Sequence, residues 1–158
     1  MSNQFLQLIE KRRSIYAIGK NVEQTPTYLT DLIQNAIKQS PSSFNSQSSR
    51  AVILFNAEHE KFWDLVKAQL KAYAKDAESA AKTDAKIDSF SAGLGTVLFF
   101  EDQEVVAGLQ ANFPSYADNF PIWSEHSTAI AQFATWTALS IEGLGASLQH
   151  YNPIVDQQ

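Results

Sequence analysis

The sequence contains no cysteine, which excludes disulfide bonds, thiol redox chemistry and thiolate metal sites. Positive charge is also scarce, since 12 lysines and arginines stand against 17 aspartates and glutamates, for a net charge of −5. Nucleic acids and anionic membranes require a basic face that releases counterions, so we expect neither as a partner. No apolar run approaches the ~20 residues of a membrane-spanning helix, and no signal segment opens the chain. We therefore expect a cytoplasmic protein.

What the sequence does contain is enough apolar material for a folded core. The chain has 158 residues, of which 44% are hydrophobic and 18% are charged. This composition is typical of a globular protein and not of a disordered one. We expect residues 1–158 to form a single domain.

Hydrophobic periodicity divides the chain into helices and buried strands. Helical spacing recurs over 3–13, 27–39, 57–75, 104–111 and 122–144, and the last is apolar enough to predict a central helix that could lie at a subunit interface. Continuous apolar runs predict strands at 51–55 and 96–100, and residues 147–152 begin another extended segment. The Ala- and Lys-rich stretch 76–88 is expected to continue the third helix as a solvated flank. Strands separated by helices indicate α/β or α+β layering.

Residues 40–50, with the sequence SPSSFNSQSSR, interrupt this pattern between a helix and a strand. Pro41 ends the preceding helix, because proline lacks a donor and restricts the residue before it. The serines, the asparagine and the glutamine predict a row of short polar side chains and free backbone amides that suits a polar, flat ligand. An ordinary Ser/Asn connection is the alternative.

Two further stretches have both a functional and a structural interpretation. Lys11-Arg12-Arg13-Ser14 suits a phosphate, because a guanidinium can bind it bidentately and the serine adds a donor. A helix C-terminus, however, attracts basic residues in any case. Four aromatic residues fall within one short loop at 112–121 and its edge, and they either staple this loop to the core or a second subunit, or line the pocket of a planar substrate. They are Phe113, Tyr116, Phe120 and Trp123.

Several common site motifs are absent. Gly93-Leu-Gly95 precedes a strand and Gly143-Leu-Gly145 closes a helix, so neither forms a dinucleotide fingerprint. The three histidines lack metal-binding spacing and no GxSxG elbow is present, which argues against a zinc enzyme and a serine hydrolase. We expect no metal. A solvated strand edge is expected for the acidic cluster Glu101, Asp102 and Glu104.

The order of motifs along the chain resembles the nitroreductase family of flavin mononucleotide (FMN) enzymes. This order is KRRS, a helix, SPSSFNSQ and a strand. The later segments GTVLFFED, FPSYADNF and GLGASLQHYNP resemble its fatty-acid-repression-mutant subgroup, and the resemblance runs from about residue 5 to residue 153. It implies an α+β fold, a three-layer sandwich whose mixed, mainly antiparallel sheet is flanked by helices. A long central helix would lie at a dimer interface.

The resemblance also implies a function. The protein would be a homodimeric, FMN-dependent NAD(P)H oxidoreductase that reduces nitroaromatics, quinones or related small acceptors in a ping-pong cycle. Because the flavin carries the hydride chemistry, no side chain is expected to be catalytic. The alternative is a non-catalytic regulatory protein on the same scaffold that senses flavin or a lipid-like ligand.

Residue roles follow from the same resemblance. Arg12 and Ser14 would contact the FMN phosphate, with Arg13 near the phosphate or the ribityl chain. A loop would meet the ring and ribityl chain, largely from the other subunit, through Pro41, Ser42, Ser43, Asn45 and Gln47. A third segment, along the hydride-accepting ring nitrogen, would be Leu148, Gln149 and His150, although His150 read alone is more typical of a structural histidine. The substrate pocket would contain Phe44, Phe113, Tyr116, Phe120 and Trp123.

The sequence departs from the family pattern in three places. Tyr16 stands where many relatives have a basic residue near the pyrimidine edge of the ring. Ser48-Ser49-Arg50 replaces a common proline-aromatic pair, as this subgroup tends to do. Relatives also continue beyond the position of Gln158 through a further strand and an arm with basic phosphate ligands. We therefore expect a nitroreductase-like FMN-binding domain without that strand and arm.

Overall fold

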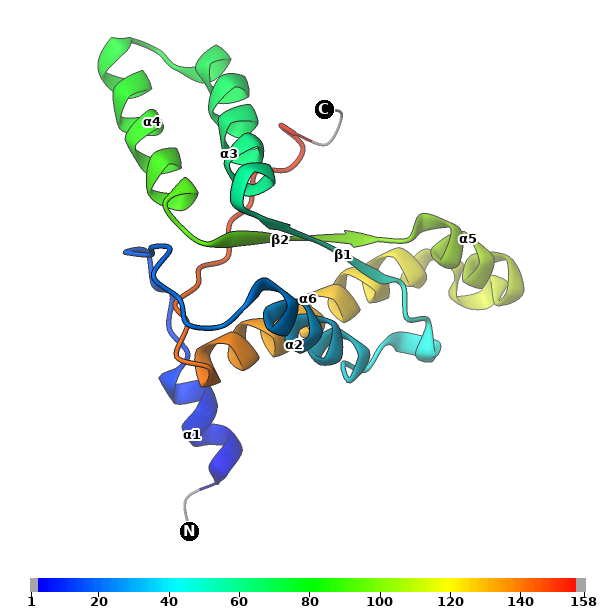
Figure 1. The fold of residues 1–158 in the computed structure, drawn as a ribbon. Coiled ribbons are helices and arrows are strands. Elements are labelled where there is room, and N and C mark those ends of the chain that lie inside the picture. The colour runs from blue at the N-terminus through cyan, green and yellow to red at the C-terminus, as the bar shows by residue number, and fades with distance from the viewer. Residues whose placement is uncertain (1–2, 156–158) are drawn as a thin grey trace. The chain divides into compact units, whose positions relative to one another are not determined.

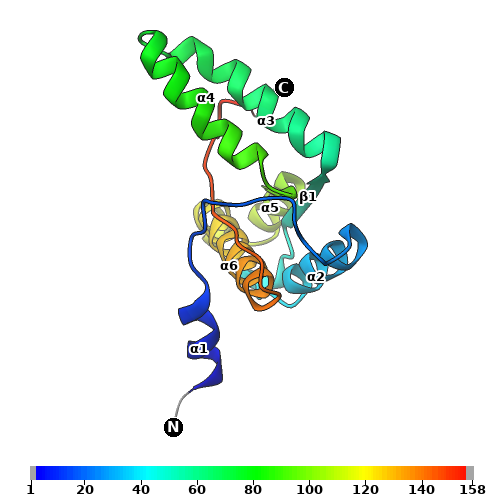
Figure 2. The same cartoon turned by 60° about the vertical axis from the view of Figure 1, so that its left-hand side comes forward.

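The structure, a computed structural model, describes residues 3–155. Its elements are shown in Figures 1 and 2. The α-helices are α1 (Gln4–Lys11), α2 (Pro26–Lys38), α3 (Asn56–Leu70), α4 (Ala77–Ser91), α5 (Gln103–Asn112) and α6 (Phe120–Ile141). The strands are β1 (Ser49–Phe55) and β2 (Gly95–Glu101). Short 3₁₀ helices are η1 (Ser43–Asn45), η2 (Lys71–Tyr73) and η3 (Pro114–Asn119).

The chain forms two compact units. Of the described residues, the first unit contains 3–12, Gln24–Val52 and Val97–Gly143. The second unit contains Arg13–Glu23, Ile53–Thr96 and 144–155. Each strand contributes residues to both units, and each unit has its own buried residues.

In the first unit, α2 packs along α6, and the two helices lie side by side in both views (Figures 1 and 2). The apolar side chains buried here are Leu29 and Ile33 from α2, Val106 from α5, and Phe120 and Ala131 from α6. Local sequence signals set the helix ends. The Thr25 hydroxyl accepts from the N–H of Tyr28 at the start of α2, and Gly143 takes a φ of 79° just after α6.

In the second unit, α3 and α4 form a helical hairpin (Figure 1). Its core consists of Trp63 and Val66 from α3 and Ile87 and Phe90 from α4, and Tyr151 packs against it. Asp76 starts α4 through a capping box with Ser79. The expectation that 76–88 continues the preceding helix as a solvated flank was therefore wrong.

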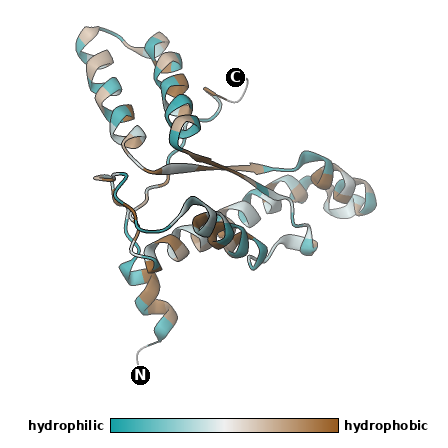
Figure 3. Ribbon diagram, in the orientation of Figure 1, coloured by the Kyte–Doolittle hydropathy of each residue, from teal (hydrophilic) through white to brown (hydrophobic). Residues whose placement is uncertain are grey.

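Strands β1 and β2 are neighbours in a two-stranded sheet. Both are hydrophobic segments of the ribbon in Figure 3. Neither contains a buried residue, however, and Val52 and Phe100 are exposed, so the expectation of strands covered on both faces was wrong for this chain. The N–H of Asp102, just after β2, donates to the carbonyl of Ser48, just before β1, at 2.9 Å, so the pair is antiparallel. The expected extended segment at 147–152 is not a strand. A single parallel bridge joins Ala146 to Ser14 instead.

Helix α6 has two chemically different sides. Its buried residues include five hydroxyl side chains, Ser124, Ser127, Thr128, Thr135 and Thr137. Its exposed side includes four large apolar residues, Ile122, Ile130, Phe133 and Ile141. At 100° per residue these four fall within an arc of about 100°, which also contains His126 and Thr137, so they form an apolar stripe that these two residues interrupt. The helix is as apolar as predicted, but part of that character faces outward in this chain.

Candidate functional site

The serine-rich loop is fastened to α6 by hydroxyl groups. The contacts join the Ser43 N–H to Ser127 Oγ at 3.3 Å, Ser48 Oγ to Ser124 Oγ at 3.0 Å, and Ser49 Oγ to Thr128 Oγ1 at 3.0 Å. The three α6 partners lie at i, i+3 and i+4, so they share one face of the helix. Ser48 is fully buried, at 0% exposure, and a buried hydroxyl requires a partner. Helix α6 therefore holds the loop in a defined position.

Hydrogen bonds inside the loop occupy its backbone amides. They run from the Asn45 N–H to the Ser42 carbonyl, from the Ser46 N–H to the Ser43 carbonyl, and from the Gln47 N–H to Ser42 Oγ at 2.9 Å. The expectation of a row of free amides was therefore wrong for these positions, because the 3₁₀ turn uses them. The side chains of Asn45 and Gln47 are exposed and could reach a ligand, although Gln47 Nε2 also donates to Asn45 Oδ1 at 3.4 Å.

The loop backbone is strained. Phe44, Asn45 and Gln47 have φ values of 56°, 51° and 51°. Asparagine tolerates this left-handed region, but a phenylalanine or glutamine there costs about 1–3 kcal/mol. Such a conformation persists only where surrounding contacts enforce it, so the loop depends on α6 and on the aromatic rings around Phe44.

All five residues that the resemblance places in a substrate pocket meet in one aromatic cluster. The Phe44 ring lies 5.1 Å from Phe113, 5.9 Å from Tyr116, 5.1 Å from Phe120 and 5.8 Å from Trp123, measured between ring centroids. The rings of Phe44 and Trp123 are stacked, with 15° between their planes. Phe120 is buried, whereas Phe44 is 48% exposed. These contacts hold the serine-rich loop against the four rings, and the role of the cluster in substrate binding stays a prediction.

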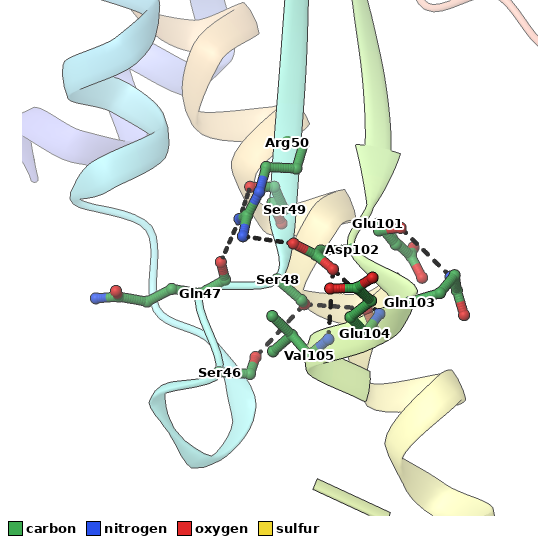
Figure 4. A network of polar contacts seen from close by, with 11 residues as sticks. Ser46, Gln47, Ser48, Ser49, Arg50, Glu101, Asp102, Gln103, Glu104 and Val105 are labelled. Atoms are coloured by element: carbon green, nitrogen blue, oxygen red, sulfur yellow. Dashed lines mark hydrogen bonds and ion pairs between the residues drawn. The ribbon is translucent and has the colours of Figure 1, made fainter. Parts of the chain in front are cut away.

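Asp102 joins the loop to helix α5, as Figure 4 shows. Its carboxylate caps α5 by accepting from the N–H groups of Glu104 and Val105, and it also pairs with Arg50 at 2.8 Å. The same arginine donates to the carbonyls of Gln47 and Ser49 at 2.7 and 3.0 Å. Asp102 is therefore a structural junction, and the expectation of a merely solvated acidic edge was wrong for this residue.

Arg12 also lies against α6. Its guanidinium carbon is 4.2 Å from the centroid of the Trp136 ring. Its Nε atom is buried and has no hydrogen-bond partner among the residues that the structure describes. Within residues 3–155, no carboxylate forms a salt bridge with Arg12. Helix α6 therefore contacts two of the predicted cofactor-binding elements. Its residues 124–128 contact the serine-rich loop, and its Trp136, about 12 Å further along the helix, contacts Arg12.

The remaining predicted cofactor residues lie in the second unit. Ser14 forms the isolated bridge with Ala146, and the neighbouring Ile15 N–H donates to the Ala146 carbonyl at 3.0 Å. This pairing places Arg13 and Ser14 beside the start of the segment that carries Leu148, Gln149 and His150. Arg13, Ser14, Leu148 and His150 are exposed. In the second unit the structure therefore brings together two motifs that are about 130 residues apart in the sequence.

Sequence analysis missed a buried polar network around His59, which is 1% exposed. Its Nε2 lies 3.1 Å from the Ser91 carbonyl, so this nitrogen carries the proton. Its Nδ1 lies 2.8 Å from Thr96 Oγ1, and that oxygen accepts from Trp63 Nε1 at 2.9 Å. Burial lowers the pKa of His59, with a smaller lowering from Lys20. No spacing motif could have revealed this contact across the fold.

Two observations bear on other classes of site. Within residues 3–155, no group of three or more His, Cys, Asp or Glu side chains is arranged to hold a metal ion. In the same part of the chain, no helix combines the length and apolar character required to cross a membrane.

Comparisons with known proteins identify the family. The Nitroreductase family profile matches residues 9–157. Nitroreductase FRM2 of Saccharomyces cerevisiae is 36% identical over 155 residues, which cover 96% of this chain and 76% of FRM2. The structure of nitroreductase CinD from Lactococcus lactis in complex with nicotinic acid has a TM-score of 0.89 at 47% identity and covers 98% of this chain and 78% of CinD. CinD complexes with chloramphenicol and with 4-nitrophenol match similarly.

The chain belongs to the nitroreductase family, and it has the fold of that family. Membership of this family identifies the protein as a nitroreductase-type oxidoreductase. The match to FRM2 also confirms the subgroup inferred from the downstream segments.

Proposed function

We propose that this protein is an FMN-dependent NAD(P)H oxidoreductase that reduces nitroaromatics, quinones or related small acceptors. Family membership supports the reaction class, and CinD, at 46–47% identity, binds 4-nitrophenol and chloramphenicol. The single observation that carries the proposal is the state of Arg12. Within residues 3–155 no carboxylate pairs with this arginine, which is located in the motif that the resemblance assigns to the cofactor phosphate.

The residues present fit an FMN molecule. A phosphate would supply acceptors for Arg12, whose buried Nε lacks one. Asn45 and Gln47 offer exposed amide side chains, which can both donate to and accept from the polar edge of a flavin. The proposed cofactor residues in the first unit are Arg12, Pro41, Ser42, Ser43, Asn45 and Gln47. Those in the second unit are Arg13, Ser14, Leu148, Gln149 and His150.

When bound, FMN supplies the redox chemistry by taking a hydride from NADH or NADPH and passing it to the acceptor. The chain binds and orients the cofactor, and no side chain is required as a catalyst. Arg12 neutralises the phosphate, and the serine-rich loop presents its amide side chains in a conformation that α6 enforces. The exposed rings of the aromatic cluster offer a planar, apolar surface to an aromatic acceptor.

We also propose that the protein works as a homodimer. The apolar stripe on α6, formed by Ile122, Ile130, Phe133 and Ile141, is exposed in a single chain. Exposed apolar surface of this kind marks an interaction site, and a second copy would bury it. Light scattering after size-exclusion chromatography should give twice the monomer mass. A monomer in the FMN-loaded state would contradict this part of the proposal.

The proposed function has a direct spectroscopic test. Purified protein supplied with FMN should be yellow and should bleach when NADH or NADPH is added without oxygen. Addition of 4-nitrophenol or a quinone should then restore the oxidised flavin spectrum. A protein that binds no FMN would contradict the proposal. Tight FMN binding without reduction by either nicotinamide would instead favour the flavin-sensing alternative.

A further inference from the structure

We infer that Trp136 is a positioning residue, which holds the Arg12 guanidinium ready for the phosphate of the cofactor. The inference rests on the proposed function, because it assumes that Arg12 meets that phosphate. Its structural basis is the 4.2 Å separation between the guanidinium carbon and the centroid of the indole ring. At this separation a cation is attracted to the face of an aromatic ring, and tryptophan attracts it more strongly than tyrosine or phenylalanine.

Arg12 is held at both ends. It is the C-cap residue of α1, and its backbone N–H donates to the Leu8 carbonyl at 3.3 Å. The far end of the side chain stacks on Trp136, which α6 carries. An arginine side chain is long and flexible, and loses conformational freedom when it binds a ligand. The stack restricts that freedom before the ligand arrives, which favours binding.

The residue that holds Arg12 is uncharged, and this matters as much as where that residue lies. Arg50 is held by the carboxylate of Asp102, and its nitrogens also donate to the carbonyls of Gln47 and Ser49. Its charge is therefore neutralised within the fold. Trp136 is uncharged, so it can orient Arg12 without neutralising it. The unpartnered, buried Nε of Arg12 agrees with a group that retains binding capacity for an anion.

The alternative role for Trp136 is purely structural, as an apolar surface that covers the end of α1. The two roles differ in what they predict for a flavin without a phosphate. A positioning role affects FMN and leaves riboflavin binding unchanged. A structural role affects the two flavins equally, or affects only the melting temperature.

The test compares FMN and riboflavin affinities by flavin fluorescence titration, for wild type, Trp136→Leu and Trp136→Phe. We expect Trp136→Leu to weaken FMN binding about three- to tenfold and to leave riboflavin binding unchanged. Trp136→Phe retains a weaker aromatic face, so its loss should be smaller. In an Arg12→Ala background, Trp136→Leu should have no further effect on FMN, because the group that it positions is gone.

Trp63→Phe is the matched control, because it alters a buried tryptophan in the core of the second unit. It should lower the melting temperature and leave the ratio of the two affinities unchanged. Equal losses for FMN and riboflavin in Trp136→Phe, or a full additional loss of FMN binding in the Arg12→Ala background, would overturn the inference alone. Failure of the wild type to bind either flavin would overturn the proposed function as well.

Discussion

The serine-rich loop of the first unit and the helical hairpin of the second are stabilised by different kinds of contact. The loop is held by hydroxyl pairs and half-exposed rings, and it contains three residues with positive φ. The α3/α4 hairpin is held by apolar side chains, of which Val66 and Ile87 are fully buried. The loop contains five of the residues proposed for the cofactor, whereas the hairpin contains none of them.

The difference predicts where the stability of this protein and, on the proposed function, its cofactor binding reside. Apolar burial contributes most to stability but offers no recognition. Each hydrogen bond between hydroxyl groups contributes less to stability. Such bonds are directional, however, so they fix the orientation of the loop, which a binding loop requires. Substitutions in the hairpin should therefore change the free energy of unfolding, and substitutions at the proposed site should change ligand affinity.

The largest effect is expected from Ile87→Ala. Ile87 has no exposed surface, so truncation leaves a cavity and should lower the free energy of unfolding by about 2–5 kcal/mol. Urea denaturation followed by circular dichroism measures this change. Lys86→Ala, at the exposed neighbouring position, is the control and should change it by less than about 0.5 kcal/mol. Similar values for the two variants would show that the hairpin core does not dominate stability.

Arg12→Ala should have the opposite profile, with a large effect on affinity and little on stability. Loss of a charge-assisted contact should weaken FMN binding about ten- to hundredfold, which corresponds to about 1.5–3 kcal/mol. Arg12→Lys should restore only part of the affinity, because a point charge does not reproduce the planar fork. Riboflavin should bind wild type and variant alike. If Arg12→Ala instead lowers the melting temperature without affecting FMN, the arginine only terminates α1.

Ser124→Ala probes the contacts that hold the loop. It removes the 3.0 Å partner of the buried Ser48 hydroxyl, which retains only a 3.5 Å contact with Ser46. We expect a loss of about 1–2 kcal/mol in the free energy of unfolding, together with weaker FMN binding. The double variant Ser48→Ala/Ser124→Ala should recover part of this loss, because neither buried hydroxyl is then left unpaired. Strict additivity of the two substitutions would show that the pair is not coupled.

The smallest effect is a pH dependence in the second unit. Burial, followed by Lys20, lowers the pKa of His59 in the folded state, while its bond to Ser91 and the charge of Glu60 act in the opposite direction. Below a pH of about 6.5 the unfolded state binds the proton first, so stability should fall with decreasing pH by at most about 1.4 kcal/mol per pH unit. Above that pH the contribution is fully present. Urea midpoints between pH 5 and 8 measure the slope, which should flatten in His59→Gln and persist in the exposed-site control His126→Gln.

Local sequence signals predicted the secondary structure well. The helix at 27–39 and the strands at 51–55 and 96–100 are confirmed to within about two residues, because caps and continuous apolar runs act over short distances. The helical pattern at 57–75 is also confirmed, although its end is a 3₁₀ turn. The order of the motifs was sufficient to identify the family.

Long-range contacts account for what sequence analysis missed. The stretch 76–88 has the composition of a solvated helix, yet Ile87 at its edge is fully buried because α4 folds back on α3. Asp102 is a cap and an ion-pair partner because antiparallel pairing brings the end of β2 to the start of β1. Burial by distant segments cannot be read from local composition.

By itself, the sequence determined most of the helices, the two strands and the family, and it supplied the residues proposed for the cofactor. The tertiary structure alone decided that α6 supports both the serine-rich loop and Arg12, and that four aromatic residues converge around Phe44. It also decided that the amides of Asn45, Ser46 and Gln47 are used inside the loop, while the side chains of Asn45 and Gln47 are exposed. The physical reason is that periodicity and capping depend on neighbours within a few residues, whereas stacking, hydroxyl pairing and burial depend on segments brought together by folding.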